Sequence, residues 1–187
     1  MNVYDFDKTI YNGDSTADFF LYCLKKHPKI AILFPSILAG FVKFYVLKIG
    51  TKTQFKQKIM RFVKYIDYKK DIEDFWNKKE SGIKDFYKAQ QKEDDIIISA
   101  SPYFVVEPMC KTLGIKHIIC SPVDKTNGDY TGENCHGKEK VVQFNIKFPD
   151  STIDEFYSDS YSDTPLAEIA NKAYMVKGDK ITPWKFR

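Results

Sequence analysis

Two carboxylates, Asp5 and Asp7, stand two residues apart near the start of the chain, directly after a short apolar run, and Thr9 follows them. Carboxylates at the end of a buried strand can be plain turn residues, because Asp favours the turns that leave a strand. A close pair of acids can also transfer protons, attack an electrophile or hold a hard metal ion. The pattern D-x-D-x-T is short, so by itself it leaves both interpretations open.

Other polar side chains follow other predicted elements in the same way. Ser99 ends the apolar run Ile96–Ile98, a predicted helix begins near Gly137–Lys140 with two lysines, and an acidic stretch runs from Ser158 to Asp163. In an open α/β sheet, ligands bind at the carboxyl ends of the strands. We therefore expect four acids, a serine and a lysine to converge in one crevice, which turn propensity alone does not predict.

Together and in this order, these stretches resemble the four motifs of the haloacid dehalogenase (HAD) superfamily of phosphohydrolases. The similar branch is that of the phosphoserine phosphatases, subfamily IB with a helical C1 cap. The first motif, D-x-D-x-[TV], matches Asp5–Thr9, and the second, an apolar strand ending in Ser or Thr, matches Ile96–Ser99. The third, a lysine that opens a helix, falls in Gly137–Lys140, and the fourth, D-x-x-x-D after a strand, matches Asp159–Asp163.

The resemblance implies a role for each carboxylate. Asp5 would be the nucleophile that forms an aspartyl-phosphate, and Asp7 would protonate the leaving alkoxide and then activate water. Asp5, Asp159 and the backbone carbonyl of Asp7 would hold Mg²⁺, which takes oxygen ligands in octahedral geometry.

The resemblance also implies a set of residues that bind the substrate. Ser99, with Ala100 and Ser101 after it, is expected to hold the phosphate. Thr9 is expected at the same site, where it supports the loop or the acid–base carboxylate. Asp14 stands where phosphoserine phosphatases usually have Glu, so it is expected either to meet the substrate or to cap the following helix. Because Asp is shorter than Glu, the resemblance leaves it open whether phosphoserine is the substrate, and Asp14 could instead gate the cap.

A lysine is expected to neutralise the charge of the transferring phosphoryl group. Lys138 and Lys140 both fit the third motif, and the pattern leaves the choice open with a slight preference for Lys140. Asp163 is expected to orient this lysine, and Ser160 is expected to support the same loop.

The elements that must position these residues change in pattern along the chain. From about Asp14 to Lys92 apolar and aromatic residues recur at helical spacing, and beyond that stretch strands alternate with helices. Alternation of this kind predicts a parallel sheet with helices on its faces. We therefore expect an α/β fold with a Rossmann-like (HAD) core at 1–13 and 93–187 and an all-α cap inserted at 14–92.

Apolar runs and turn residues predict where the elements begin and end. Strands are predicted at 3–6, 96–99, 115–120, 153–157 and 173–176, helices at 103–113, 138–144 and 166–172, and a turn or hairpin at 124–132. The stretch Ile181–Trp184 could be a tail that packs on the core or a strand at an interface.

Composition narrows the class of protein. The chain has 187 residues, of which 43% are apolar and 16% aromatic, which suits one domain with an insertion and argues against disorder. Its four cysteines form no C-x-x-C pair, so they predict reduced thiols rather than a zinc site or a disulfide framework. The start of the chain lacks the basic-then-apolar pattern of a signal peptide, so a cytoplasmic location is expected.

Charge is distributed unevenly along the chain. The net charge is +4, yet Lys25–Lys64 contains ten Lys or Arg and no Asp or Glu. A basic cap suits an anionic substrate, either a phosphorylated small molecule or a lipid head group. It also suits an anionic membrane surface as a partner, with the protein peripheral to it. Nucleic acid is not expected as a partner, because the acidic half holds the crevice and no nucleic-acid motif is present.

The apolar run Ile30–Val42 within the basic stretch has two interpretations. It falls short of the length that spans a bilayer, and Pro35 interrupts it. The first interpretation is a buried pair of cap helices. The second is an amphipathic, basic element that lies on an anionic membrane.

The function predicted from these observations is a Mg²⁺-dependent phosphomonoester hydrolase. The alternatives are a catalytically weak phosphate-binding module and a peripheral membrane-binding module. The presence of Asp5, Asp7, Ser99 and Asp159 together favours the enzyme.

Overall fold

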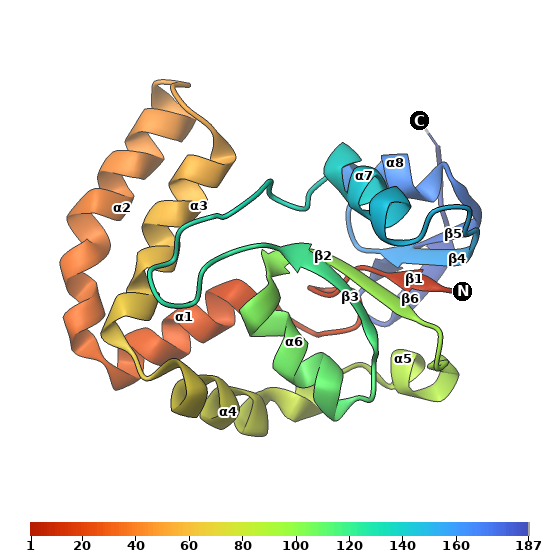
Figure 1. Ribbon diagram of the computed structural model, residues 1–187, viewed down its shortest axis with the longest axis horizontal. Helices are drawn as coiled ribbons and strands as arrows, with labels where there is room; N and C mark the ends of the chain where they lie inside the picture. The colour runs from red at the N-terminus through yellow and green to blue at the C-terminus, as the bar shows by residue number, and fades with distance from the viewer. Residues whose placement is uncertain (187) are drawn as a thin grey trace.

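A six-stranded sheet forms the centre of the computed structural model, which describes residues 1–186 (Figure 1). The strands are β1 (Val3–Tyr4), β2 (Ile96–Pro102), β3 (His117–Ser121), β4 (Ile153–Ser158), β5 (Ala170–Lys177) and β6 (Lys180–Pro183). Their order across the sheet is β3-β2-β1-β4-β5-β6, with β1 to β5 parallel and β6 antiparallel to β5. The predicted α/β fold with a mostly parallel sheet is confirmed.

Helices cover the sheet and fill a long insertion between β1 and β2. The insertion contains α1 (Ser15–Lys26), α2 (Phe34–Phe41), α3 (Lys52–Met60), α4 (Tyr68–Lys79) and α5 (Asp85–Gln90). Short 3-10 or π segments adjoin them at Pro28–Leu33, Val42–Val46, Arg61–Tyr65 and Glu80–Gly82. The rest of the chain carries α6 (Tyr103–Thr112), α7 (Lys138–Lys147) and α8 (Thr164–Ala167), with a 3-10 turn at Tyr161–Asp163. The assignment of residues 14–92 to a separate cap stays a prediction.

The central strands are buried on both faces, which explains their continuous apolar sequences. Alternate residues of β1 and β2 belong to two different apolar clusters, with Val3 and Ile96 in one and Tyr4 and Ile97 in the other. The first cluster includes side chains of α7 and α8, and the second includes side chains of α6, α1 and α4. The sheet is therefore the middle layer, and the strand ends are the part of it that a ligand can reach.

Aromatic side chains fasten the inserted helices to the core. The ring of Trp76 on α4 packs edge-on against Phe6 and Tyr11, with ring centroids 5.9 and 5.3 Å away. Its indole N–H donates a hydrogen bond of 2.8 Å to the carbonyl oxygen of Val105 on α6. The α2–α3 hairpin, in contrast, stands beside the core as an arm (Figure 1).

One predicted element of the core is wrong. The helix predicted at 166–172 ends at Ala167, and residues from Ala170 onward form β5 instead. Ala170 pairs in parallel with Ile153 of β4, so ladder hydrogen bonds outweigh the local helical pattern. The other predicted core strands and helices are present, with ends shifted by a few residues. The chain end pairs as β6 at the edge of the same sheet.

The apolar run Ile30–Val42 is not a buried pair of helices. Within the helical stretch Pro28–Val46 the buried residues are Ile30 and Gly40. This stretch has 19 residues and a mean hydropathy of 1.6, and 11% of it is buried. Among the described residues it is the one helix that is long and apolar enough to cross a membrane, judged by length and composition alone. It stays exposed because α2 packs on α3, while its opposite side has no covering element in Figure 1.

Candidate active site

The carboxyl ends of β1, β2 and β4 surround a crevice of about 200 Å³. The polar residues that line it are Asp5, Asp7, Lys8, Asp14, Ser99, His136, Lys140, Asp159, Ser160, Ser162 and Asp163. They come from separate loops that the parallel strands bring to one edge of the sheet. The structure thus brings together the acids, the serine and one lysine of the four sequence motifs.

A tight loop after β1 presents the first two acids. The backbone N–H of Ile10 donates to the carbonyl oxygen of Phe6 at 3.1 Å, which folds the chain back on itself. Lys8 takes a φ of 58°, a left-handed conformation that is uncommon for residues other than glycine. Its carbonyl oxygen accepts a hydrogen bond of 2.7 Å from Nζ of the buried Lys84, just before α5. The inserted segment therefore helps to hold the loop that carries the acids.

A buried lysine connects two of the acids. Nζ of Lys140 lies 2.6 Å from Oδ1 of Asp5 and 2.7 Å from Oδ2 of Asp163. The hydroxyl of Ser158 also donates to Oδ2 of Asp163, at 2.8 Å. Lys138, two residues earlier, is exposed at the first residue of α7. Of the two lysines in the third motif, the structure thus places Lys140 in the crevice.

Burial dominates the electrostatics of this cluster. It raises the pKa of Asp5 to about 7, although the ammonium of Lys140 opposes the shift. Burial alone would lower the pKa of Lys140, but Asp5 and Asp163 outweigh it and hold that pKa above its ordinary value. Lys140 is therefore a permanent cation, and the acids around it exceed it in charge.

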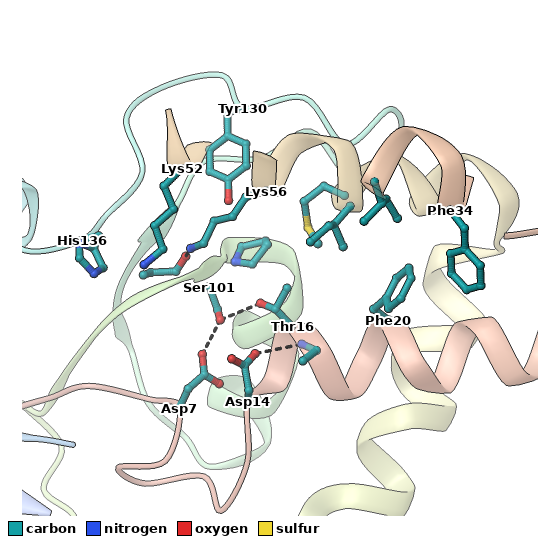
Figure 2. A pocket seen from close by; sticks show the side chains of 16 residues that line it. Asp7, Asp14, Thr16, Phe20, Phe34, Lys52, Lys56, Ser101, Tyr130 and His136 are labelled. Carbon is teal, nitrogen blue, oxygen red and sulfur yellow. Dashed lines mark hydrogen bonds between the residues drawn. The ribbon is translucent and has the colours of Figure 1, made fainter. Parts of the chain in front are cut away.

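Asp7 is held between the start of α1 and the end of β2 (Figure 2). The backbone N–H of Ser15 donates to Oδ1 of Asp7 at 2.7 Å, and the hydroxyl of Ser101 donates to Oδ2. The Ser101 hydroxyl also lies 2.8 Å from that of Thr16 on α1. Burial raises the pKa of Asp7, and the charge of Asp14 adds to the shift. A raised pKa favours the protonated form of Asp7, as a group that donates a proton requires.

Thr9 lies beneath the crevice and connects two of its loops. Its fully buried hydroxyl donates to Oδ2 of Asp5 at 3.4 Å and accepts a hydrogen bond of 3.0 Å from the backbone N–H of Asp159. Ser99 lines the crevice, and its hydroxyl oxygen accepts a hydrogen bond of 3.1 Å from the backbone N–H of Ser101. Thr9 therefore supports the site, while Ser99 is in a position to meet a ligand.

Asp14 and Ser160 both cap helical segments at the edge of the crevice. Oδ1 of Asp14 accepts a hydrogen bond of 2.9 Å from the backbone N–H of Ala17, as the N-cap of α1. The hydroxyl of Ser160 accepts from the backbone N–H of Ser162 at 3.3 Å. Asp14 and Ser160 still line the crevice, so capping does not withdraw them from a ligand.

A second cavity, of about 440 Å³, adjoins the crevice (Figure 2). Asp7, Asp14, Ala100 and His136 line both spaces. The remaining walls are largely apolar and include Ala17, Phe20, Phe34, Ile37, Ile59, Met60 and Pro102. In Figure 2 the labelled acids and basic side chains gather toward one end, and the two phenylalanine rings lie at the other. The combined space is therefore polar at the sheet edge and apolar beyond it.

Lys56 of α3 reaches the polar end of this cavity. Its Nζ donates to the carbonyl oxygen of Ala100 at 3.3 Å and to Oδ1 of Asn134 at 3.0 Å. Burial lowers the pKa of Lys56 to about 8, and the neighbouring Lys52 adds to the shift. Sequence reasoning missed both lysines, which look like any others in a basic stretch. It also missed His136, whose sole signal was its place directly before the third motif.

The oxygen donors at the crevice fit a hard divalent cation. Asp5 and Asp159 line the crevice with their carboxylates, and Asp7 belongs to the same loop as Asp5. Burial raises the pKa of Asp5 and of Asp159, so a cation between them would stabilise their charged forms. Within residues 1–186 no three His, Cys, Asp or Glu side chains form a metal-binding group.

Comparison with known sequences agrees with this arrangement. The family model of the haloacid dehalogenase-like hydrolases matches residues 3–168. Protein CicA of Caulobacter vibrioides (strain NA1000 / CB15N) is 34% identical over 88 residues, which cover 43% of this chain and 40% of CicA. The chain thus matches about two fifths of the length of the curated relatives, CicA from two strains.

Solved structures share the fold at low sequence identity. A protein of unknown function from Bordetella pertussis Tohama I has a TM-score of 0.71 and 20% identity, over 92% of this chain and 87% of that one. A phosphoserine phosphohydrolase-like protein from Francisella tularensis subsp. tularensis SCHU S4 has a TM-score of 0.55 and 20% identity, over 92% and 86%. Since the family model covers most of the chain, the resemblance read from the four motifs is confirmed, and this chain belongs to the haloacid dehalogenase-like hydrolase family.

Proposed function

We propose that this protein is a Mg²⁺-dependent phosphomonoester hydrolase that works through an aspartyl-phosphate. The observation that carries the proposal is the buried group of Asp5, Asp7 and Lys140 at the sheet edge of a hydrolase fold. A nucleophile, a proton carrier and a fixed cation are the groups that phosphoryl transfer through a covalent intermediate needs. A phosphoserine phosphohydrolase-like protein with the same fold supports this reading.

Asp5 is the proposed nucleophile. Lys140 holds one oxygen of its carboxylate and Thr9 holds the other, so the carboxylate has one orientation at the end of β1. A carboxylate oxygen of Asp5 attacks phosphorus, and the bond between phosphorus and the leaving oxygen breaks as the new bond forms. Lys140 stabilises the negative charge on the phosphoryl oxygens during transfer.

Asp7 is the proposed proton carrier for both steps. Its raised pKa lets it donate a proton to the leaving oxygen in the first step. The resulting carboxylate then takes a proton from a water molecule that attacks phosphorus. The bond from phosphorus to Asp5 breaks, and inorganic phosphate and the free carboxylate are released. Ser15 and Ser101 keep Asp7 in place throughout.

The donor set described above would hold Mg²⁺ through the carboxylates of Asp5 and Asp159 and the backbone carbonyl of Asp7. The bound ion supplies charge neutralisation between an anionic nucleophile and an anionic substrate. Ser99, at the end of β2, lines the same crevice and is in a position to donate a hydrogen bond to a phosphate oxygen.

The leaving group is proposed to occupy the second cavity, because that space opens directly next to Asp7. A small phosphate ester or the head-group phosphate of a phospholipid both suit a crevice of this kind. The apolar walls at Phe20 and Phe34 favour an ester whose leaving group has an apolar portion. Lys52 and Lys56 lie where the two spaces join and supply positive charge to an anionic substrate.

The test is hydrolysis of p-nitrophenyl phosphate by the wild type, Asp5→Asn and Asp7→Asn, with Mg²⁺ and with a chelator. The expected result is Mg²⁺-dependent turnover that falls by about a thousandfold or more in either variant. Asp85→Asn is the matched control, since Asp85 is a fully exposed aspartate on α5 and should turn over like the wild type. Thermal unfolding of each variant separates loss of chemistry from loss of fold.

A substrate panel then tests the leaving-group site. It compares phosphoserine, glycerol phosphate and a short-chain phosphatidylglycerophosphate at equal phosphate concentration. A higher kcat/KM for the lipid-like ester is expected, and the advantage should shrink in Phe20→Ser, which makes the cavity wall polar. Absence of turnover on the generic ester and on every member of the panel would contradict the proposed enzyme and favour a phosphate-binding module.

A further inference from the structure

We propose that the α2–α3 hairpin docks this protein on the surface of an anionic lipid bilayer. Nine large apolar side chains lie exposed on α2, on the segments that flank it and on the turn before α3. Phe34 lines the second cavity, and Phe41 and Tyr45 pack against Phe55 of α3. The other six we name the outer apolar face, and they are Ile32, Leu38, Val42, Val46, Leu47 and Ile49. Leu38, Val42 and Val46 are spaced four residues apart in continuous helical backbone, so they lie next to one another along one side of it rather than as scattered single residues.

The outer apolar face is too exposed to be part of a core. Leu38 in α2 is 64% exposed, and Val46 in the π-helical turn that follows is 63% exposed. The opposite side of α2 packs on α3, where Gly40 lets the helices approach, because a Cβ there would lie 2.5 Å from the Lys58 side chain. Soluble monomers rarely leave a contiguous apolar patch of this kind open unless it binds something.

The charged residues around the outer apolar face indicate which kind of partner binds it. The face lies within Lys25–Lys64, which has ten cations and no acid, and Lys43 and Lys48 are exposed at its tip. An apolar stripe bordered by lysines is the composition of helices that lie at the interface of an anionic membrane. The lysines meet the lipid phosphates while the apolar side chains enter the boundary between head groups and acyl chains.

A second copy of the chain is the less suitable occupant. An isologous contact would bring the same basic stretch of two copies together, because both partners use one patch. Like charges placed opposite each other weaken such a contact, and no acidic residue between Lys25 and Lys64 relieves it. An anionic bilayer, in contrast, complements both the charge and the apolar character of the face.

The geometry favours a hairpin that lies on the bilayer over one that crosses it. α3 runs back beside α2 toward the core and carries Lys52, Lys56 and Lys58. Lys58 hydrogen-bonds Ser36 of α2 at 3.5 Å, so a spanning α2 would take these cations into the hydrocarbon with it. The 19-residue helical stretch Pro28–Val46 is therefore expected to lie along the membrane surface rather than across the bilayer.

The docking face also adjoins the second cavity. Phe34 lines that cavity and is itself 45% exposed, and Ile37 lines it directly beside Leu38 of the outer face. A lipid-like phosphate ester could therefore enter the cavity from the membrane side of α2. This last link rests on the proposed function, whereas docking itself does not depend on catalysis.

The test is flotation of the full-length protein with vesicles made of equal parts phosphatidylglycerol and phosphatidylcholine, compared with phosphatidylcholine alone. The expected result is binding to the anionic vesicles that weakens as salt is raised, with little binding to the neutral ones. Leu38→Glu/Val46→Glu should weaken binding by about a hundredfold, since both apolar contacts are lost and two acids face the lipid. Val142→Glu/Ile146→Glu is the matched control, because these residues are 47% and 70% exposed on the surface of α7, away from the hairpin.

Three outcomes overturn the proposal: no binding of the wild type at low salt, equal binding of the two double variants, or a stable dimer in solution that Leu38→Glu/Val46→Glu dissociates. Asp5→Asn should bind vesicles like the wild type, because Asp5 lies in the crevice and not on the hairpin. Vesicle binding without turnover would thus leave docking intact and count against the proposed enzyme. Turnover of p-nitrophenyl phosphate without vesicle binding would support the proposed enzyme and count against docking.

Discussion

Replacement of Lys140 by methionine tests the charge balance of the crevice. Nζ of Lys140 lies within 2.7 Å of carboxylate oxygens of both Asp5 and Asp163, and its side chain is 2% exposed. Methionine has a similar length and no charge, so the variant leaves two buried carboxylates without their shared cation. Breaking a buried ion pair from one side costs about 3–5 kcal/mol of folding free energy.

The loss should depend on pH in a direction that the structure specifies. Burial already raises the pKa of Asp5 to about 7 with Lys140 opposing it, so removal of Lys140 raises that pKa further. Above the ordinary pKa of an aspartate, the folded variant then binds more protons than the unfolded chain. Its stability must fall as pH rises, by up to about 1.4 kcal/mol per pH unit for one such group.

The assay is urea unfolding in the absence of Mg²⁺ at pH 5.5 and pH 7.5, with tryptophan fluorescence as the signal. Lys140→Met is expected to be destabilised at both pH values and more so at the higher one. Adding Asp163→Asn should restore much of the stability, since one uncompensated charge is gone, but it should not restore turnover. Lys138→Met is the control, because this exposed lysine should change stability by less than about 0.5 kcal/mol. A Lys140→Met protein as stable as the wild type, with no added pH dependence, would refute the account of the buried cluster.

Three further predictions concern residues around this cluster. Lys56→Met should raise KM severalfold with little change in kcat. In the wild type, KM should increase as pH is raised beyond about 8, because Lys56 then loses its charge. Steady-state kinetics measured across this pH range test both expectations. Ser101→Ala should lower kcat about tenfold. It should also move the limb of the pH–rate profile that reports Asp7 to higher pH, because the hydrogen bond from Ser101 lowers the pKa of Asp7 in the wild type. A limb that stays at the same pH would contradict this explanation. Trp76→Phe should cost about 1–3 kcal/mol in urea unfolding, since it removes the hydrogen bond from the indole N–H to the carbonyl oxygen of Val105 and leaves part of a buried ring site unfilled. An unchanged midpoint would show that neither contact adds stability.

Helix geometry decided a choice that the sequence had left open. Lys138 and Lys140 both fit the third motif, but an α-helix turns about 100° per residue, so side chains two positions apart point to widely different sides. The start of α7 directs Lys140 toward Asp5 and Asp163 and leaves Lys138 in solvent. The sequence contained both candidates, and the direction of the helix relative to the sheet selected one.

Pairing partners explain where local patterns misled. Residues 170–172 have a helical pattern of their own, yet Ala170 pairs with Ile153 and Lys172 with Glu155 in the sheet. The apolar run Ile30–Val42 suggested burial, yet α2 has a neighbour on one side only. In both cases the deciding partner is far away in the sequence, so periodicity within a short window carried no information about it.

The sequence by itself determined the α/β class and the acids of the site. The apolar runs that end at Asp7, Ser99 and Ser158 specify parallel strands, and parallel strands place their carboxyl ends at one edge. Only the tertiary structure showed that Lys56 of α3 meets the end of β2, and that an apolar cavity opens beside Asp7. The physical reason is sequence distance. The periodicity of a sequence reports on residues a few positions apart, whereas a cavity forms between helices and strands that are far apart in the sequence and that packing brings together.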